Sequence, residues 1–265
     1  MAVAVFTLLS TTGGVLAQEG RPDPATRLET LESSIKDGDI NAILEAANFA
    51  KNNGLPDDAS RLFNQVLGLD AFNAKAHAGL GHRKFMDCWC DQSEIDDFKA
   101  TLDEEKKDVT LKMLRKEVFA DNTYVARDAL KKFDASSRAW SVDTAYNLLE
   151  KVDDEWIEEI AIGIFSRWAG DRARDLWIKR CRRGGFTRCT IKMIEALQPN
   201  VTGELSNPAT KYLVDEVTGQ RNENVSLKCL EVLAGVKTDE ITQVLRKFLN
   251  RCDNQNVKQK LLAIL

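Results

Sequence analysis

Apolar side chains recur along this chain at steps of three and four residues, the spacing of one face of an α-helix. The clearest case is TDEITQVLRKFLN, residues 238–250, whose apolar positions are Ile241, Val244, Leu245, Phe248 and Leu249. Thr238 stands before two acids and is a suitable N-cap. Segments 39–54 and 55–68 have the same character, and no segment sustains a period of two. The pattern predicts an all-α protein.

Two stretches near the end of the chain repeat one another. NENVSLKCLEVL, residues 222–233, returns 32 residues later as NQNVKQKLLAIL, residues 254–265. The matched positions are Asn222/Asn254, Asn224/Asn256, Val225/Val257, Lys228/Lys260, Leu230/Leu262 and Leu233/Leu265. A fainter echo places Cys189, Lys192, Ile194 and Leu197 at the same relative spacing. A single helix pair cannot bury its apolar stripe, so repetition predicts stacked pairs.

A second repeat signal lies at residues 40–81. Gly54, Ala59 and Phe63 are followed by LGLDAFNAKAHAGLG, residues 67–81. This spacing resembles the tetratricopeptide repeat over about one and a half degenerate copies, with Ala71 in place of the usual proline. The C-terminal helix pairs resemble short HEAT-like repeats of bacterial proteins. Both resemblances imply an α-α superhelix, that is, a solenoid.

The expected organisation is therefore a tetratricopeptide-like helical part at 27–95 and a HEAT-like repeat array at 96–265, with the joint at 92–104. Segment 81–98 breaks the repeat pattern and is expected to form a turn around Trp89 that leads into a short acidic helix. Such arrays commonly hold other proteins, so this analogy predicts a non-catalytic interaction or scaffold protein with a protein or peptide partner and no cofactor.

Residues 1–17, MAVAVFTLLSTTGGVLA, carry no charge, and small residues at Val15 and Ala17 suit cleavage before Gln18. We interpret the stretch as a signal peptide, followed by a polar tether at 18–26. The chain is then exported to the periplasm or the cell surface and does not span a membrane once the signal is cleaved. The alternative is an uncleaved apolar N-terminus, since the stretch lacks a basic residue.

Six cysteines follow, an even number that permits disulfides in an exported protein. Cys181–Cys189 and Cys229–Cys252 could each tie neighbouring helices. The alternative is that the thiols are free and buried, where cysteine acts as a small apolar residue.

A basic segment occupies residues 167–192 in a chain whose net charge is −4. Its nine cations are Arg167, Arg172, Arg174, Lys179, Arg180, Arg182, Arg183, Arg188 and Lys192, against two acids. These side chains could bind a polyanion, a polysaccharide or, less favoured for an exported protein, nucleic acid. The alternative is a solvated helix face whose cations pair with the acidic segments at 94–108 and 153–159.

Catalytic and metal-binding signals are weak. His82, Cys88 and Cys90 can be drawn around zinc or as a Cys–His nucleophile, but CxC is not the usual zinc spacing and a fourth ligand is missing. No phosphate-binding loop, nucleophile elbow or HExxH motif occurs. We therefore predict neither an enzyme nor a metal site.

The chain ends on KQKLLAIL, which is apolar for the end of a solenoid. Either this last helix turns its apolar side inward, or it makes a contact with a partner or a second copy. Self-association through the C-terminal helix is therefore one of the expectations.

Overall fold

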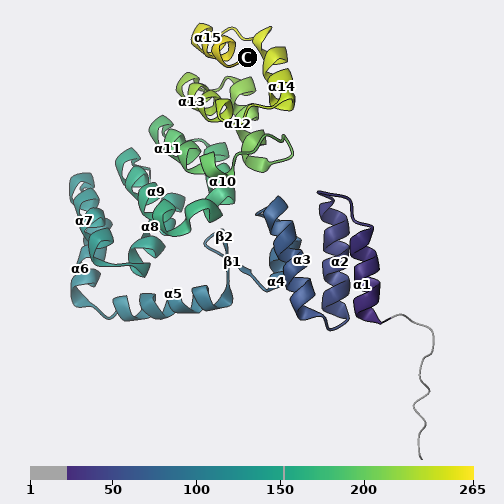
Figure 1. Cartoon of the computed structure of the whole chain (residues 1–265). Helices are drawn as coiled ribbons and strands as arrows, with labels where there is room; N and C mark the ends of the chain where they lie inside the picture. Colours follow the sequence, from purple (N-terminus) through teal and green to yellow (C-terminus); the bar gives the residue numbers. More distant parts are fainter. Residues whose placement is uncertain (1–22, 152) are drawn as a thin grey trace, which may run out of the picture. The chain divides into compact units, whose positions relative to one another are not determined.

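A computed structural model describes residues 23–151 and 153–265, so the expected signal peptide lies outside the described residues. The described chain is all-α apart from one small hairpin, and it divides into two units at Leu80/Gly81 (Figure 1). That boundary precedes the expected joint at 92–104, and the acidic helix expected after Trp89 spans Gln92–Glu105. The expected tether also ends early, because a helix begins at Pro24 rather than after residue 26.

In the described part of the first unit, residues 23–80, the helices are α1 (Pro24–Ser33), α2 (Ile40–Asn52), α3 (Pro56–Leu69) and α4 (Ala74–Leu80). Asp39 caps α2 through its bond to the Ala42 amide. Gly54, at φ +76°, makes the turn into α3, a conformation that favours glycine. A Cβ added to Gly79 would lie 2.4 Å from the Phe63 ring, so only glycine lets α4 approach α3 this closely.

The second unit begins with a hairpin of β1 (Arg83–Phe85) and β2 (Cys88–Cys90), in which Lys84 faces Trp89. The helices that follow are α5 (Gln92–Glu105), α6 (Val109–Val118), α7 (Thr123–Ser136), α8 (Ala139–Lys151), α9 (Glu155–Ala169), α10 (Arg174–Arg183), α11 (Thr187–Leu197), α12 (Pro208–Gly219), α13 (Glu223–Ala234), α14 (Asp239–Leu249) and α15 (Gln255–Ile264). Short 3-10 turns, Gly170–Ala173 and Gln198–Asn200, follow α9 and α11.

The hairpin is a feature that the sequence pattern did not predict. Its turn consists of Met86 and Asp87, both with positive φ, where two-residue hairpins usually place Asn and Gly. Asp87 is held from outside the hairpin by the Tyr146 hydroxyl at 3.3 Å and by Lys179 at 3.2 Å. These distant partners stabilise a turn for which the local sequence gives no signal.

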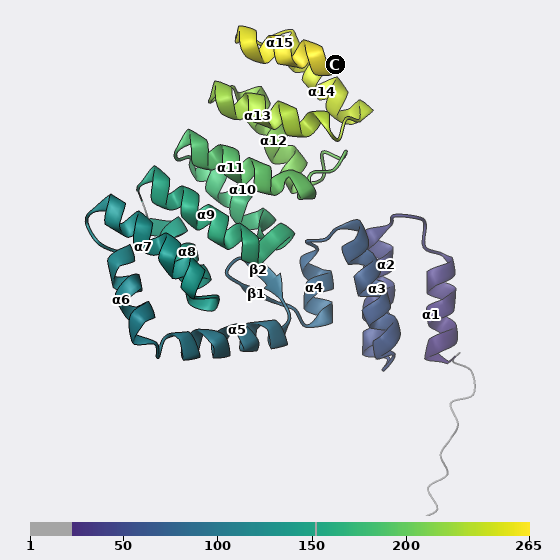
Figure 2. The same cartoon turned by 60° about the vertical axis from the view of Figure 1, so that its left-hand side comes forward.

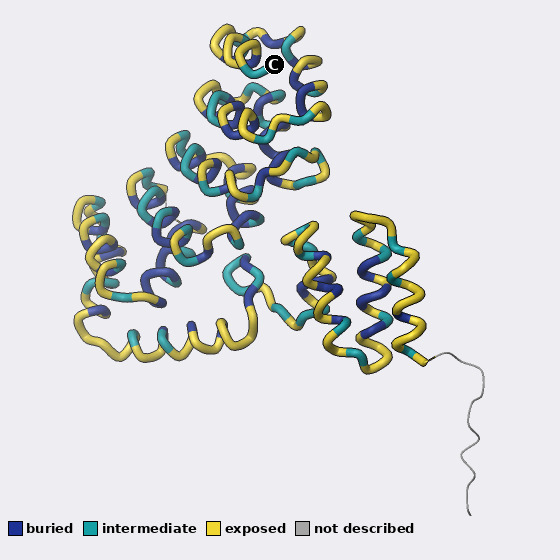
Figure 3. The backbone as a smooth tube through the Cα atoms, viewed as in Figure 1, coloured by how far each residue is buried: buried dark blue, intermediate teal, exposed yellow. Residues whose placement is uncertain are grey.

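From α6 onward the helices pack as consecutive pairs: α6 with α7, α8 with α9, and so on to α14 with α15 (Figures 1 and 2). The second helices of these pairs, α7, α9, α11, α13 and α15, each contact the next and form a row. Helices α10, α12 and α14 form a second row. The buried positions lie where the helices meet, and Figure 3 shows them as dark stripes along each helix.

The row of second helices reveals a repeat that is longer than the sequence suggests. Their N-caps are residues 122, 154, 186, 222 and 254, so the pairs recur every 32 residues except for one step of 36 residues. Seven residues after each N-cap stands a buried side chain: Ala129, Ala161, Met193, Cys229 and Leu261. Positions 225, 229, 257 and 261, which lie in the two stretches that repeat one another in the sequence, are all buried in the core.

The contacts of its first asparagine, Asn222 or Asn254, explain why the NxNV motif is repeated. Asn222 accepts a bond from the Val225 amide and donates 2.9 Å to Thr187 of the preceding pair. Asn254 accepts from the Val257 amide and donates 2.9 Å to Glu223. Each asparagine thus caps its own helix and bonds to the pair before it, which a cap of another type would not do as well.

Candidate functional site

The basic segment 167–192 is mostly engaged inside the second unit. Seven of its nine cations pair with carboxylates: Arg167 with Asp134, Arg172 with Glu94, Arg174 with Asp175, Lys179 with Asp87, Arg180 with Glu158, and both Arg188 and Lys192 with Glu159. Arg182 and Arg183 are exposed and make no ion pair with any described residue. The segment therefore offers two free guanidinium groups rather than a continuous cationic face.

Arg180 and Glu158 form a buried ion pair between α10 and α9. Their nitrogen and oxygen lie 2.6 Å apart, and only 12% and 5% of the two side chains are exposed. A pair this deeply buried holds two helices in register, because either charge alone would lack solvation. Arg180 is thus a structural residue and is not available to a ligand.

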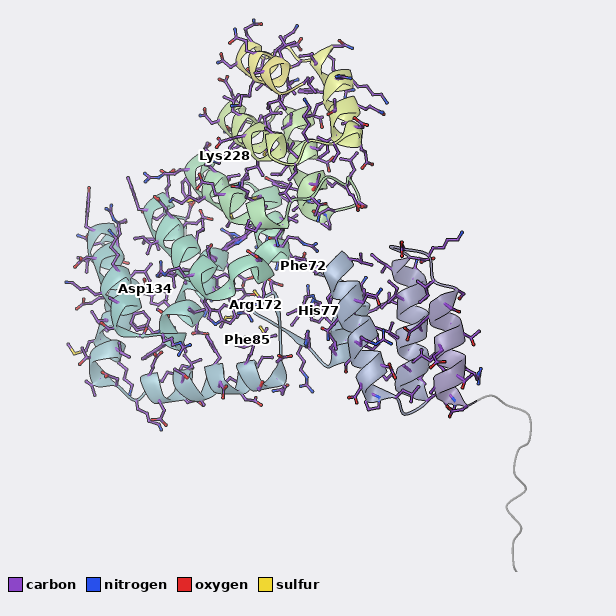
Figure 4. The ribbon with its side chains drawn as sticks, in the orientation of Figure 1. Phe72, His77, Phe85, Asp134, Arg172 and Lys228 are labelled. Carbon is purple, nitrogen blue, oxygen red and sulfur yellow. The ribbon has the colours of Figure 1, made fainter. Side chains whose placement is uncertain are left out.

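Arg172 joins the α9–α10 corner to the hairpin region, and Figure 4 labels it beside Phe85. Its guanidinium lies over Trp168 at 5.2 Å and donates to Glu94 at 3.2 Å. Phe85, Phe98 and Trp168 pack edge-on around this point. Tyr146 closes the same region, and burial together with the Asp87 charge raises its pKa to about 12.

All six cysteines lie within the described residues, and all are free and buried. The pairs Cys181–Cys189 and Cys229–Cys252 are not disulfide-bonded. The structure instead matches the alternative expectation, in which the thiols are free and buried. Burial raises the pKa of Cys88, Cys181 and Cys189 to about 12 each. Thiols of this kind are almost fully protonated near neutral pH and are poor nucleophiles.

The metal and nucleophile interpretations of His82, Cys88 and Cys90 find little geometric support. The His82 Nε2 lies 2.8 Å from an Asp91 carboxylate oxygen. Cys88 and Cys90 project from the same side of β2 into the core. Across residues 23–151 and 153–265, no group of three or more His, Cys, Asp or Glu side chains is placed to hold a metal ion.

An open groove of about 460 Å³ lies across α7, α9 and α11. Its floor comes from α9, where Trp156, Ile160 and Gly163 follow one another at steps of four and three residues. Arg127 and Lys131 from α7 stand on one side, and Arg188 and Lys192 from α11 on the other. We call this the α7–α9–α11 groove.

Trp156 is the residue whose role sequence reasoning missed. The apolar run 156–168 predicts a largely buried helix, and Ile157, Ile162 and Phe165 are indeed buried. Trp156 instead is 43% exposed. It is flanked by the guanidinium groups of Arg127 and Arg188, 4.8 Å and 4.6 Å from the ring centre. An exposed aromatic fixed by two cations is a ready contact surface.

The charges of the groove are unbalanced. Glu159, with 15% of its side chain exposed, is shared by Arg188 at 2.9 Å and Lys192 at 3.2 Å. Arg127 and Lys131 make no ion pair with any described residue. The acids of α7 are engaged elsewhere, Asp128 with Lys132 and Asp134, which Figure 4 labels, with Arg167. The α7 side therefore presents two uncompensated cations.

Gly163 lies in the middle of α9, where glycine costs about 1 kcal/mol relative to alanine. A Cβ built on it would meet only the Arg167 Nη1, at 3.9 Å, so packing within the protein does not require glycine here. One turn later the Ser166 hydroxyl, also in the groove lining, has no hydrogen-bond partner among the described residues. The missing side chain at Gly163 leaves the α9 backbone open to the groove at this position, whereas the Ser166 hydroxyl is buried.

No family model, no curated protein and no solved structure matches this chain. The site must therefore be argued from its own geometry. In the described parts of the chain, no helix has the length and apolarity needed to cross a membrane.

Proposed function

We propose that this protein is a non-catalytic interaction or scaffold protein whose helix pairs present the α7–α9–α11 groove to a peptide segment of a partner. The observation that carries the proposal is the exposed Trp156, fixed between Arg127 and Arg188 over an apolar floor. Exposed aromatics with flanking arginines are typical of binding hot spots. The protonated thiols and the lack of a catalytic motif support a role without chemistry.

Binding of short fluorescent peptide pools, measured by fluorescence anisotropy, tests the proposal. We expect the Trp156→Ala variant to fold normally and to lose most of the binding, because the side chain is exposed and contributes little to the core. Tyr124→Ala is the matched control, since Tyr124 is 81% exposed and lies outside the groove. If Trp156→Ala and Tyr124→Ala bind as the unchanged chain does, the groove is not the binding site.

A second candidate is a polyanion or polysaccharide binder. It is favoured by Arg182 and Arg183, which are exposed beside Gly184 and Gly185 at the end of α10. The other seven cations already have carboxylate partners, so this function would rest on these two. A heparin column decides: the variant Arg182→Glu with Arg183→Glu should elute at lower salt, and unchanged elution excludes the candidate.

Export to the periplasm or cell surface remains part of the proposal. It rests on residues 1–17, which lie outside the described residues. Buried thiols are compatible with an oxidising compartment, because reagents do not reach them. Mapping the N-terminus of the protein from its native host tests export: a mature chain that begins at Gln18 is expected, and one that retains Met1 contradicts a cleaved signal.

Self-association through the C-terminal helix would depend on Leu262. Leu261 is fully buried, and Ile264 and Leu265 pack against the core, whereas Leu262 is 61% exposed. Removing α15 altogether would open the core, so Leu262→Ser is the sharper test. Light scattering should show dimers of the unchanged chain that this substitution dissociates. If the unchanged chain is monomeric at all concentrations, it does not self-associate through α15.

A further inference from the structure

Resting on the proposed function, we infer that the α7–α9–α11 groove binds an acidic, extended peptide segment of a partner protein, with one carboxylate seated over Gly163. The inference comes from comparing equivalent positions of the repeat. The residue nine positions after the N-cap is Lys131 in α7, Gly163 in α9, Glu195 in α11 and Glu231 in α13.

In the neighbouring helix α11, the residue at this position forms an ion pair with the next helix of the row. Glu195 of α11 binds Lys228 of α13 at 3.0 Å, and Figure 4 labels Lys228 on the row of second helices. Lys192 of α11 is the equivalent of Lys228, since each stands six residues after its N-cap. The residue of α9 that would pair with Lys192 in the same way is residue 163, which is glycine. Lys192 pairs with Glu159 instead.

The groove therefore lies where α9 lacks the carboxylate that α11 and α13 carry at this position. The same place gathers Lys131 and Arg127, the two cations of the groove lining without a described carboxylate partner. A carboxylate supplied by another molecule would complete the arrangement that Glu195 and Lys228 show one pair further along. This charge complementarity favours an acidic partner over a basic or neutral one.

The size of the groove favours an extended segment. It reaches across three packed helices whose axes are about 8–10 Å apart, so it spans about 16–20 Å. An extended chain covers about 3.3 Å per residue, so about five or six residues fit. The apolar floor at Trp156 and Ile160 would receive an apolar side chain of the same segment.

The first experiment needs no ligand. Gly163→Glu supplies the missing carboxylate, and Gly163→Gln fills the same volume without charge. We expect both full-length variants to fold, with the Glu variant melting a few degrees higher than the Gln variant at low salt, and with the difference lost at high salt. Adding Arg127→Ala and Lys131→Ala should shrink that difference, which separates the groove cations from the local contribution of Arg167. Equal melting of the Glu and Gln variants would overturn the inference.

The second experiment measures binding of the full chain to pools of fluorescein-labelled peptides of about eight residues, a length slightly beyond the groove. One pool mixes Asp and Glu with Leu and Phe, a second replaces the acids by Asn and Gln, and a third replaces them by Lys. The acidic pool should bind roughly tenfold more tightly than the amide pool, an advantage that salt reduces.

The variant Arg127→Ala with Lys131→Ala should lose that advantage. Its matched control is Arg246→Ala with Lys247→Ala, the same two residue types, exposed on α14 and outside the groove. Equal binding of acidic and amide pools, both abolished by Trp156→Ala, would overturn the acidic partner while the peptide-binding function stands. Binding of no pool overturns both, and polyphosphate or heparin displacing the acidic pool at the same residues would identify a polyanion site instead.

Discussion

Leu230→Ala tests the packing on which the whole second unit depends. Leu230 is fully buried in α13, and α13 contacts both α11 and α15. Burial of a leucine side chain contributes about 1.5–3 kcal/mol, and the cavity left by alanine adds to the loss. Helices on two sides prevent the surrounding structure from closing the cavity. We therefore expect the free energy of unfolding to fall by about 2–5 kcal/mol.

Leu262→Ala is the matched control, because Leu262 occupies the same position of the next pair. It is 61% exposed, since α15 has α13 and α14 as its packing partners and leaves this side uncovered. The same chemical change should then cost less than about 0.5 kcal/mol. Two leucines at equivalent positions of one repeat are expected to differ by at least about 1.5 kcal/mol for this reason alone.

Urea unfolding followed by tryptophan fluorescence measures the difference. All five tryptophans lie within residues 81–265, so the signal reports on the second unit. The slope of the free energy against urea should be unchanged, so that a shifted midpoint reports stability. A loss below about half a kcal/mol for Leu230→Ala, or equal losses for both variants, would refute the assigned packing.

Three further outcomes follow from the buried groups. Arg180→Ala should cost about 3–5 kcal/mol in urea unfolding because it leaves a buried carboxylate unpaired, whereas Arg182→Ala with Arg183→Ala should cost less than about 0.5 kcal/mol; similar losses would contradict the buried pair. Asn254→Ala should lower the free energy of unfolding by about 1–2 kcal/mol, measured with urea, because the N-cap of α15 is lost. An unchanged free energy of unfolding would contradict the role of Asn254 as a cap that also bonds to the preceding pair. Burial raises the pKa of Cys181 from 9.0 to about 12, so its stabilisation, present below pH 9, should be lost as pH rises towards 12. Urea unfolding at pH 8 and pH 10.5 measures this loss, and a Cys181→Ala variant whose stability falls as steeply with pH would contradict the assignment.

The helices were predictable because their signals are local. The stripe of 238–250 gives α14 with Thr238 as its N-cap, as expected. The faint echo at 189–197 lies in a helix, α11, and its apolar positions Cys189, Ile194 and Leu197 are all buried. Helices α7 and α9 belong to the same row, but seven and eleven residues after their N-caps they carry alanine and phenylalanine, where α11 and α13 carry methionine or cysteine and leucine. This difference hides the similarity when only the residue types are compared.

The candidate site was much less predictable, because its residues depend on partners distant in sequence. The expected acidic segments at 94–108 and 153–159 do supply Glu94, Glu158 and Glu159 as partners of the basic segment. Arg167 and Lys179 instead pair with Asp134 and Asp87, and nothing in the local pattern identifies those two acids as neighbours. Conversely, Arg127 and Lys131 are unremarkable in the sequence. Their significance appears only when α7 is placed beside α9.

Repetition and binding place opposite demands on this chain. A stack of pairs is stable when each pair presents the same apolar and charged contacts to the next, as Glu195 and Lys228 do. A ligand needs a place where those contacts are incomplete. Gly163 is such a place: it gives up helix propensity and an ion pair, and no internal contact requires its small size. Because local rules are broken at functional sites more often than elsewhere, the interruption of the repeat at Gly163 directs the search for a partner to this groove.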